Sequence, residues 1–102
     1  MHFEGKWDIV ITTPIGQQKV RLAIRDADGR LAGAATQGDE TVPFQNVIVD
    51  GERLRWTQDV AKPFPLSIKF DVTVRGDVMS GTAKAGVFPT SKLIGQRATG
   101  SG

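Results

Sequence analysis

Apolar and polar residues alternate along most of the chain with a period of two. Leu66, Ile68 and Phe70 are each separated by one polar residue, and similar runs recur from the start of the chain to its end. A strand turns every second side chain to the same face, so this period is typical of β-strands with one dry and one solvated face. Helical periodicity is nearly absent. The pattern therefore predicts an all-β protein.

Glycine, proline and aspartate stand in short groups between the apolar runs, as tight turns require. Asp50-Gly51 is among the strongest short hairpin signals, and Asp28-Gly29 is another. Together the turns divide the chain into eight predicted strands, which lie near residues 7–12, 19–25, 31–36, 42–49, 53–60, 66–74, 78–85 and 93–99.

Eight short strands joined by short connections favour an up-and-down antiparallel meander. An open meander leaves two unpaired edge strands, whereas closure removes both and buries the apolar faces without any helix. A two-sheet sandwich is the alternative, but sandwiches usually need Greek-key crossings. At 102 residues the chain is long enough for one domain and too short for two. We therefore expect a single closed β-barrel of about eight strands over residues 1–99, followed by a disordered tail at 100–102.

The charge and composition of the chain limit the kinds of molecule that it is expected to bind. The net charge is only +2, and basic residues are interleaved with acidic ones, so no footprint for nucleic acid or a membrane surface stands out. No apolar run approaches the roughly 20 residues of a membrane helix, and the amino-terminal residues do not resemble a signal peptide. These observations predict a cytoplasmic protein without nucleic-acid or membrane partners.

Residues that could catalyse a reaction are few. The single histidine is His2, near the end of the chain, and cysteine and tyrosine are both absent. No catalytic triad and no metal-ligand spacing can be assembled, and most carboxylates fall at predicted turns, which they stabilise. The sequence therefore predicts no catalytic residue, metal or cofactor. It favours a non-enzyme, although an enzyme acting through a barrel pocket stays open.

The two ends of the chain carry one informative pair. In a closed meander the first and last strands are neighbours, so Arg97 can lie across the ring of Trp7. Such a cation–π contact contributes about 0.5–2 kcal/mol, depending on desolvation. We expect Trp7 and Arg97 to plug one end of the barrel.

This pairing resembles a known group of proteins. A Gly-x-Trp on the first strand and an arginine on the last are similar to the lipocalin, fatty-acid-binding-protein and avidin barrels, and the short helix-free chain is closest to the avidin-like end. It also resembles small uncharacterised bacterial domains sometimes appended to hydrolases. The resemblance rests on four stretches, Gly5-Lys6-Trp7, 13–16, 51–56 and 76–81. It implies a fold and leaves the ligand open, because these barrels bind unrelated molecules.

The barrel interior is the first candidate site. Gly81 and the alanines that follow it on the same face would leave space beside Trp56, Phe70 and Met79. An eight-stranded barrel is just wide enough for side chains or for one small ligand. Two readings stay open: a small apolar ligand occupies this space, or the large side chains fill it.

Apolar residues in the connections are the second candidate site. Ile15, Phe64 and Phe88 lie in three connections that fall at one barrel end. They could form an apolar rim for ligand entry or for a partner, or they could cover the core.

Apolar residues on outward faces are the third candidate site. The strand at 42–49 is apolar on both faces, and Val47 and Val49 share the face expected to point outward. Val10 and Ile94 are expected outside as neighbours on the first and last strands. Such patches are typical of subunit interfaces. We expect a homodimer or tetramer and a module that binds a small apolar ligand; the alternative is an interaction domain with a filled core.

Overall fold

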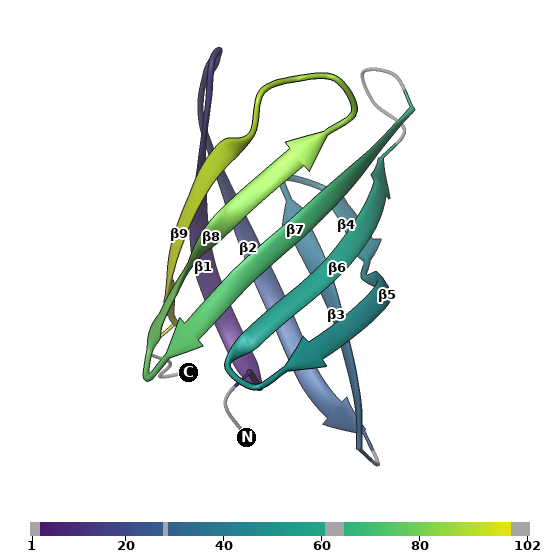
Figure 1. Cartoon of the computed structure of the whole chain (residues 1–102), viewed down its shortest axis with the longest axis vertical. Helices are drawn as coiled ribbons and strands as arrows, with labels where there is room; N and C mark the ends of the chain where they lie inside the picture. Colours follow the sequence, from purple (N-terminus) through teal and green to yellow (C-terminus); the bar gives the residue numbers. More distant parts are fainter. Residues whose placement is uncertain (1–2, 28, 61–64, 99–102) are drawn as a thin grey trace.

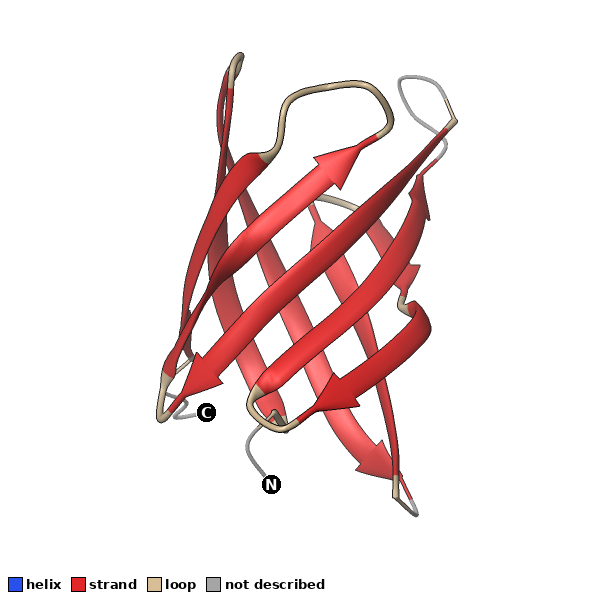
Figure 2. Cartoon of the chain, in the orientation of Figure 1, coloured by secondary structure: helices blue, strands red, loops and turns tan. Residues whose placement is uncertain are grey.

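The computed structural model describes residues 3–27, 29–60 and 65–98 as a nearly closed, antiparallel β-barrel (Figures 1 and 2). The predicted fold class is confirmed. These residues contain no helix, and hence none that could cross a membrane. Nine strands make up the barrel: β1 Gly5–Thr13, β2 Gly16–Ala27, β3 Arg30–Gln37, β4 Glu40–Pro43, β5 Gln45–Asp50, β6 Arg53–Val60, β7 Leu66–Arg75, β8 Val78–Ala85 and β9 Ser91–Arg97.

The strands follow one another as a meander, and the first and last strands pair. Their order in the sheet is β4-β3-β2-β1-β9-β8-β7-β6-β5. Trp7 on β1 lies opposite Arg97 on β9, and Ile9 lies opposite Gly95. The two ends of the chain are therefore joined by backbone pairing in the middle of the sheet, and the sheet edges lie at β4 and β5.

One predicted strand is divided in two. The run at 42–49 forms the end of β4 and most of β5, and Phe44 lies between the two strands. Phe44 still donates its backbone N–H to the carbonyl of Gly33 on β3 at 2.8 Å, and Gln45 already pairs with Thr57 on β6. The chain thus passes from one wall of the barrel to the other within two residues.

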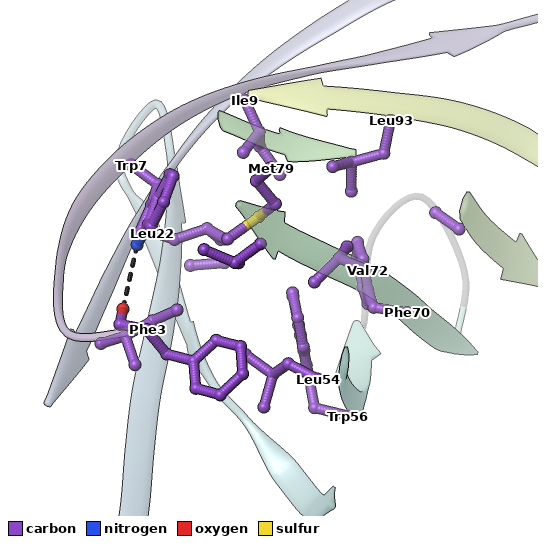
Figure 3. Close-up of a cluster of buried hydrophobic side chains, with 14 residues drawn as sticks. Phe3, Trp7, Ile9, Leu22, Leu54, Trp56, Phe70, Val72, Met79 and Leu93 are labelled. Carbon is purple, nitrogen blue, oxygen red and sulfur yellow. Dashed lines mark hydrogen bonds between the residues drawn. The ribbon is translucent and has the colours of Figure 1, made fainter. Parts of the chain in front are cut away.

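Large side chains meet inside the barrel (Figure 3). The ring of Trp56 stacks between two others, 4.3 Å from Phe44 and 4.8 Å from Phe70 between centroids. Gly33 leaves the room for Phe44, since a Cβ at this glycine would lie 2.6 Å from the ring. The buried hydrophobic side chains form one cluster: Phe3, Trp7, Ile9, Leu22, Ile24, Ala35, Leu54, Trp56, Phe70, Val72, Val74, Met79, Ala83 and Leu93.

The two ends of the barrel differ. The start of β1 and the end of β9 lie at the same end of the barrel as the β7–β8 turn, and we call this the closed end (Figure 1). There Phe3 is buried, and its carbonyl accepts a hydrogen bond from Trp7 Nε1 at 3.0 Å. The β1–β2 turn and the β8–β9 connection lie at the opposite end, which we call the mouth.

Candidate functional site

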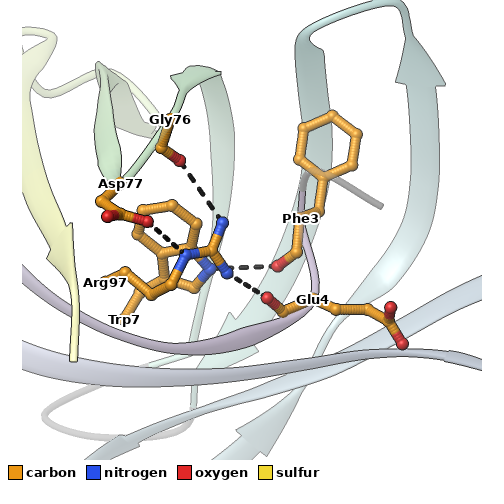
Figure 4. A network of polar contacts seen from close by, with 6 residues as sticks. All are labelled: Phe3, Glu4, Trp7, Gly76, Asp77 and Arg97. Atoms are coloured by element: carbon orange, nitrogen blue, oxygen red, sulfur yellow. Dashed lines mark hydrogen bonds and ion pairs between the residues drawn. The ribbon is translucent and has the colours of Figure 1, made fainter. Parts of the chain in front are cut away.

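Arg97 organises the closed end (Figure 4). Its guanidinium lies 4.3 Å from the centroid of the Trp7 ring, so the contact expected from the sequence is present. Nε donates to Asp77 Oδ1 at 2.9 Å, and the terminal nitrogens donate to the carbonyls of Glu4 and Gly76. One side chain thereby holds the amino-terminal segment, the β7–β8 turn and β9 together.

Sequence reasoning missed most of these partners. Phe3 and Glu4 precede the first strand, and Asp77 was interpreted only as a turn residue. The sequence gives only a weak indication of these contacts, namely that the apolar residue Phe3 lies four positions before Trp7. Arg97 is 93 positions from Glu4 along the chain, so only the closed barrel brings them into contact.

Three of the residues expected to line an interior ligand pocket are buried in the hydrophobic core. Trp56, Phe70 and Met79 are 2%, 5% and 0% exposed, and they belong to one cluster. A Cβ added at Gly81 would lie 2.0 Å from the backbone oxygen of Asp71 on β7, so β7 and β8 approach closely at this position.

Gln58 is the one buried polar side chain among the described residues. Its Oε1 accepts a hydrogen bond from Trp56 Nε1 at 2.9 Å, two positions away on the same face of β6. A buried indole N–H needs such a partner. This residue therefore satisfies the indole of the aromatic stack, and it is not among the site residues expected from the sequence.

Two of the three rim residues can be placed, at the mouth. Ile15 is 89% exposed in the β1–β2 turn, so it covers no core. Phe88 is 47% exposed in the β8–β9 connection, whose shape is fixed by Lys84: its Nζ donates to the carbonyls of Gly86 and Phe88. Phe64 lies outside the described residues.

The expected outer patch divides between two places. Val10 and Ile94 are partners across β1 and β9 on the outer face, and Ile94 is 62% exposed. Val47, in contrast, packs half-buried against the core, and Val49 lies opposite the inward-facing Leu54. The prediction that these two side chains lie on the outer face of their strand is therefore wrong.

A β-bulge causes this error. Asn46 has a φ of 53°, and the register between β5 and β6 shifts between Gln45 and Ile48. Two residues on β5 thus lie opposite one on β6, which reverses the inside–outside alternation beyond the bulge.

Two shallow depressions flank Val10 on the outer face. One of about 430 Å³ is lined by Asp8, Lys19, Arg21 and Thr36. The other, of about 600 Å³, crosses β8, β9, β1 and β2. We call this second region the β1–β9 patch and define it by six outward-facing residues, Val10, Thr12, Ser80, Thr82, Lys92 and Ile94.

The β1–β9 patch carries unbalanced positive charge. Lys92 within it and Lys19 beside it form no ion pair among the described residues. The nearby carboxylate of Asp8 already binds Arg21 at 2.8 Å and raises the pKa of that guanidinium. The patch therefore combines apolar side chains, hydroxyls and an unpaired cation.

The described residues hold no group of three or more histidines, cysteines, aspartates or glutamates that could bind a metal. Comparison with known proteins adds no functional residue, since no family model, curated protein or solved structure matches the chain.

Proposed function

We propose that this barrel is a non-catalytic interaction module and that the β1–β9 patch is its contact surface. The observation that carries the proposal is the position of Ile94. This side chain is 62% exposed and lies beside a depression of about 600 Å³, while the large residues of the interior are packed together. An apolar side chain rimmed by polar groups is typical of an interaction site.

Charge indicates the kind of partner. Lys19 and Lys92 form no ion pair with a carboxylate of the described residues, so a protein surface with an apolar side chain between carboxylates complements the patch. A second copy docked through the same patch would bring these lysines together without adding an unpaired carboxylate. A partner of different sequence therefore fits better than a homodimer through this face.

Site-specific photocrosslinking in cells tests the proposal. A photoreactive amino acid at position 94 should capture a partner whose contacting peptide contains aspartate or glutamate beside apolar residues. The same group at position 69 on β7, also exposed and outward-facing, is the control and should capture far less. Equal capture from both positions would contradict the proposal, and a crosslink to a second copy would replace the acidic partner by a homo-oligomer.

A second candidate is a small apolar ligand in the barrel, as in the avidin and lipocalin barrels that the sequence resembles. It is favoured by Ile11 and Ile68, which pack against the core but are only half-buried. Native mass spectrometry of freshly purified protein tests this candidate. A ligand should appear as added mass and be lost in Ile68→Trp, whose larger ring would occupy the same space.

A further inference from the structure

The two edges of the sheet are not equally protected. β4 has four residues and ends at Pro43, which blunts it as a template for another strand. β5 has six residues, Gln45–Asp50, with an apolar centre and with neither proline nor lysine. Beyond the point where the chain crosses from one wall to the other, β5 and β3 diverge toward the closed end (Figure 1). β5 is therefore the open edge of this barrel.

Hairpin geometry shows which backbone groups β5 presents. Asp50 and Arg53 close a two-residue loop and so exchange backbone hydrogen bonds. In an antiparallel ladder, hydrogen-bonded pairs alternate with pairs that are not hydrogen-bonded. Ile48 therefore exchanges backbone hydrogen bonds with Arg55 on β6, and Val49, between Ile48 and Asp50, turns its N–H and C=O away from β6. Among the described residues, no partner for these groups of Val49 exists.

β3, across the gap from β5, also presents backbone groups that could pair with an added strand. By the same alternation, the hairpin closed by Ala27 and Arg30 turns the backbone groups of Leu31 and Gly33 away from β2. The bond from Phe44 N–H to Gly33 O agrees with this assignment. β4 covers β3 only from Ala34 onward, so the backbone groups of Leu31 on the side that faces β5 have no partner in the part of the chain that the structure describes.

The side chains of β5 also lack cover. Val49 shares a face with Leu54, which is fully buried, yet Val49 is 47% exposed because no strand lies beyond it. Ile48, on the opposite face of β5, is 50% exposed. An added strand would bury apolar surface on both faces and satisfy the backbone between them.

We propose that β5 accepts an extended segment of a partner protein as an added strand, placed between β5 and the lower part of β3. This mode of recognition uses the backbone for affinity and alternate side chains for specificity. A free segment can pair with Val49 on one side and Leu31 on the other. The β5 strand of a second copy cannot pair on both sides in this way, because one of its two sides is already paired with its own β6.

Charge defines the outward-facing residues of the segment. Arg55 on β6 lies opposite Ile48, Arg30 begins β3, and Arg25 on β2 lies opposite Ala32. All three are exposed and form no ion pair among the described residues, and Asp50 is the one carboxylate on β5. Glutamate or aspartate facing outward would complement these arginines. Apolar residues facing inward would cover Val49. The segment is therefore expected to alternate acidic and apolar residues. The proposal does not depend on the β1–β9 patch.

The test is an NMR titration of the full chain with an eight-residue peptide of alternating valine and glutamate. The amide signals of Val49 and Leu31 should shift most. A peptide methylated on alternate backbone nitrogens should bind about tenfold more weakly or worse, because it cannot complete the ladder. A valine–lysine peptide should lose affinity by a similar factor through repulsion by the arginines.

Two variants separate edge pairing from other binding. Val49→Pro removes the outward N–H without removing a bond to β6, and it should weaken binding about tenfold. Val49→Thr keeps the N–H and should bind within about twofold of the original chain. Circular dichroism checks that both variants are folded. The proposal is overturned by shifts confined to Val10 and Ile94, by equal binding of the N-methylated peptide, or by undiminished binding to folded Val49→Pro.

Discussion

At the scale of single residues, Trp7 and Arg97 account for the closed end. Trp7 is fully buried, donates to the carbonyl of Phe3 and carries the guanidinium of Arg97 on its ring. Each contact ties the first strand to a different part of the chain. The ring thus supports both the core and the attachment of the amino-terminal segment.

Trp7→Ala should therefore lower the free energy of unfolding by about 3–5 kcal/mol, the usual loss for a large aromatic core residue. That is enough to unfold a domain of this size. Chemical denaturation measures the change. Trp7→Phe keeps an aromatic ring and should lose less. A nearly neutral Trp7→Ala would contradict the assigned role.

Gly81 is required by close packing between strands. An added Cβ would lie 2.0 Å from the backbone oxygen of Asp71, and backbone atoms cannot move aside as a flexible side chain can. We expect Gly81→Ala to lower the stability by about 1–3 kcal/mol or more, as overpacking does. Ser80→Ala, at the next position but facing outward, is the control and should change the midpoint of thermal unfolding little.

At the scale of strands, the passage from β4 to β5 depends on Asn46. Its φ of 53° lies in the left-handed region, which asparagine and glycine tolerate and β-branched residues do not. Asn46→Val should cost about 1–2 kcal/mol, whereas Asn46→Gly should be close to neutral. Thermal unfolding compares the two variants. Equal losses would show that the side chain of Asn46, rather than its backbone conformation, supports the bulge.

An ion pair joins β6 to β7 and gives a dependence on pH. Arg53 donates to both carboxylate oxygens of Asp71 and, with help from Arg55, lowers the pKa of Asp71 below its usual 3.8. The folded state then binds the proton less readily than the unfolded chain. The stability from this pair is present above pH 3.8 and is lost as the pH falls through the lower folded-state pKa.

Asp71→Asn should therefore cost less than about 1 kcal/mol at neutral pH, because solvent screens an exposed pair. The difference from the original chain should disappear in strong acid. Urea unfolding at several pH values measures it. Thr82→Ala, on the neighbouring strand, should show no such pH dependence. A loss at neutral pH that persists unchanged in strong acid would contradict this account.

At the scale of the whole molecule, the first and last strands pair in the middle of one wall of the barrel, and the two edge strands lie on the opposite side. β1 pairs with β9 at the centre of the sheet, while β4 and β5 share the position where the ring would close. Large side chains pack the interior from the closed end to the aromatic stack. Both proposals therefore place binding on the outside, at the β1–β9 patch and at the edge of β5.

Much of this architecture could be predicted from the sequence. The period of two predicted that Trp7, Trp56 and Phe70 face inward, and they do, because a strand without bulges preserves the alternation over its whole length. The same rule failed at Val47 and Val49. One extra residue at the bulge reverses the alternation, and asparagine is too common in turns and loops to indicate a bulge by itself.

The candidate sites were less predictable. Val10 and Ile94 could be placed as outward neighbours because both follow from strand phase and from pairing of the first and last strands. Whether Trp56, Phe70 and Met79 line a cavity or fill it could not be decided, since that depends on how side chains from different strands share one volume.

The sequence by itself determined the strands, most of their inward and outward faces, and the contact between Trp7 and Arg97. These follow from local alternation, turn residues and the closure of a meander. Only the tertiary structure decided that Phe44 stacks on Trp56, that Phe3 and Asp77 complete the closed end, and that β5 is an open edge. Each of these depends on how residues far apart in the chain meet. Phe44 reaches Trp56 where the chain changes walls, and Arg97 reaches Asp77 where β9 pairs with β1.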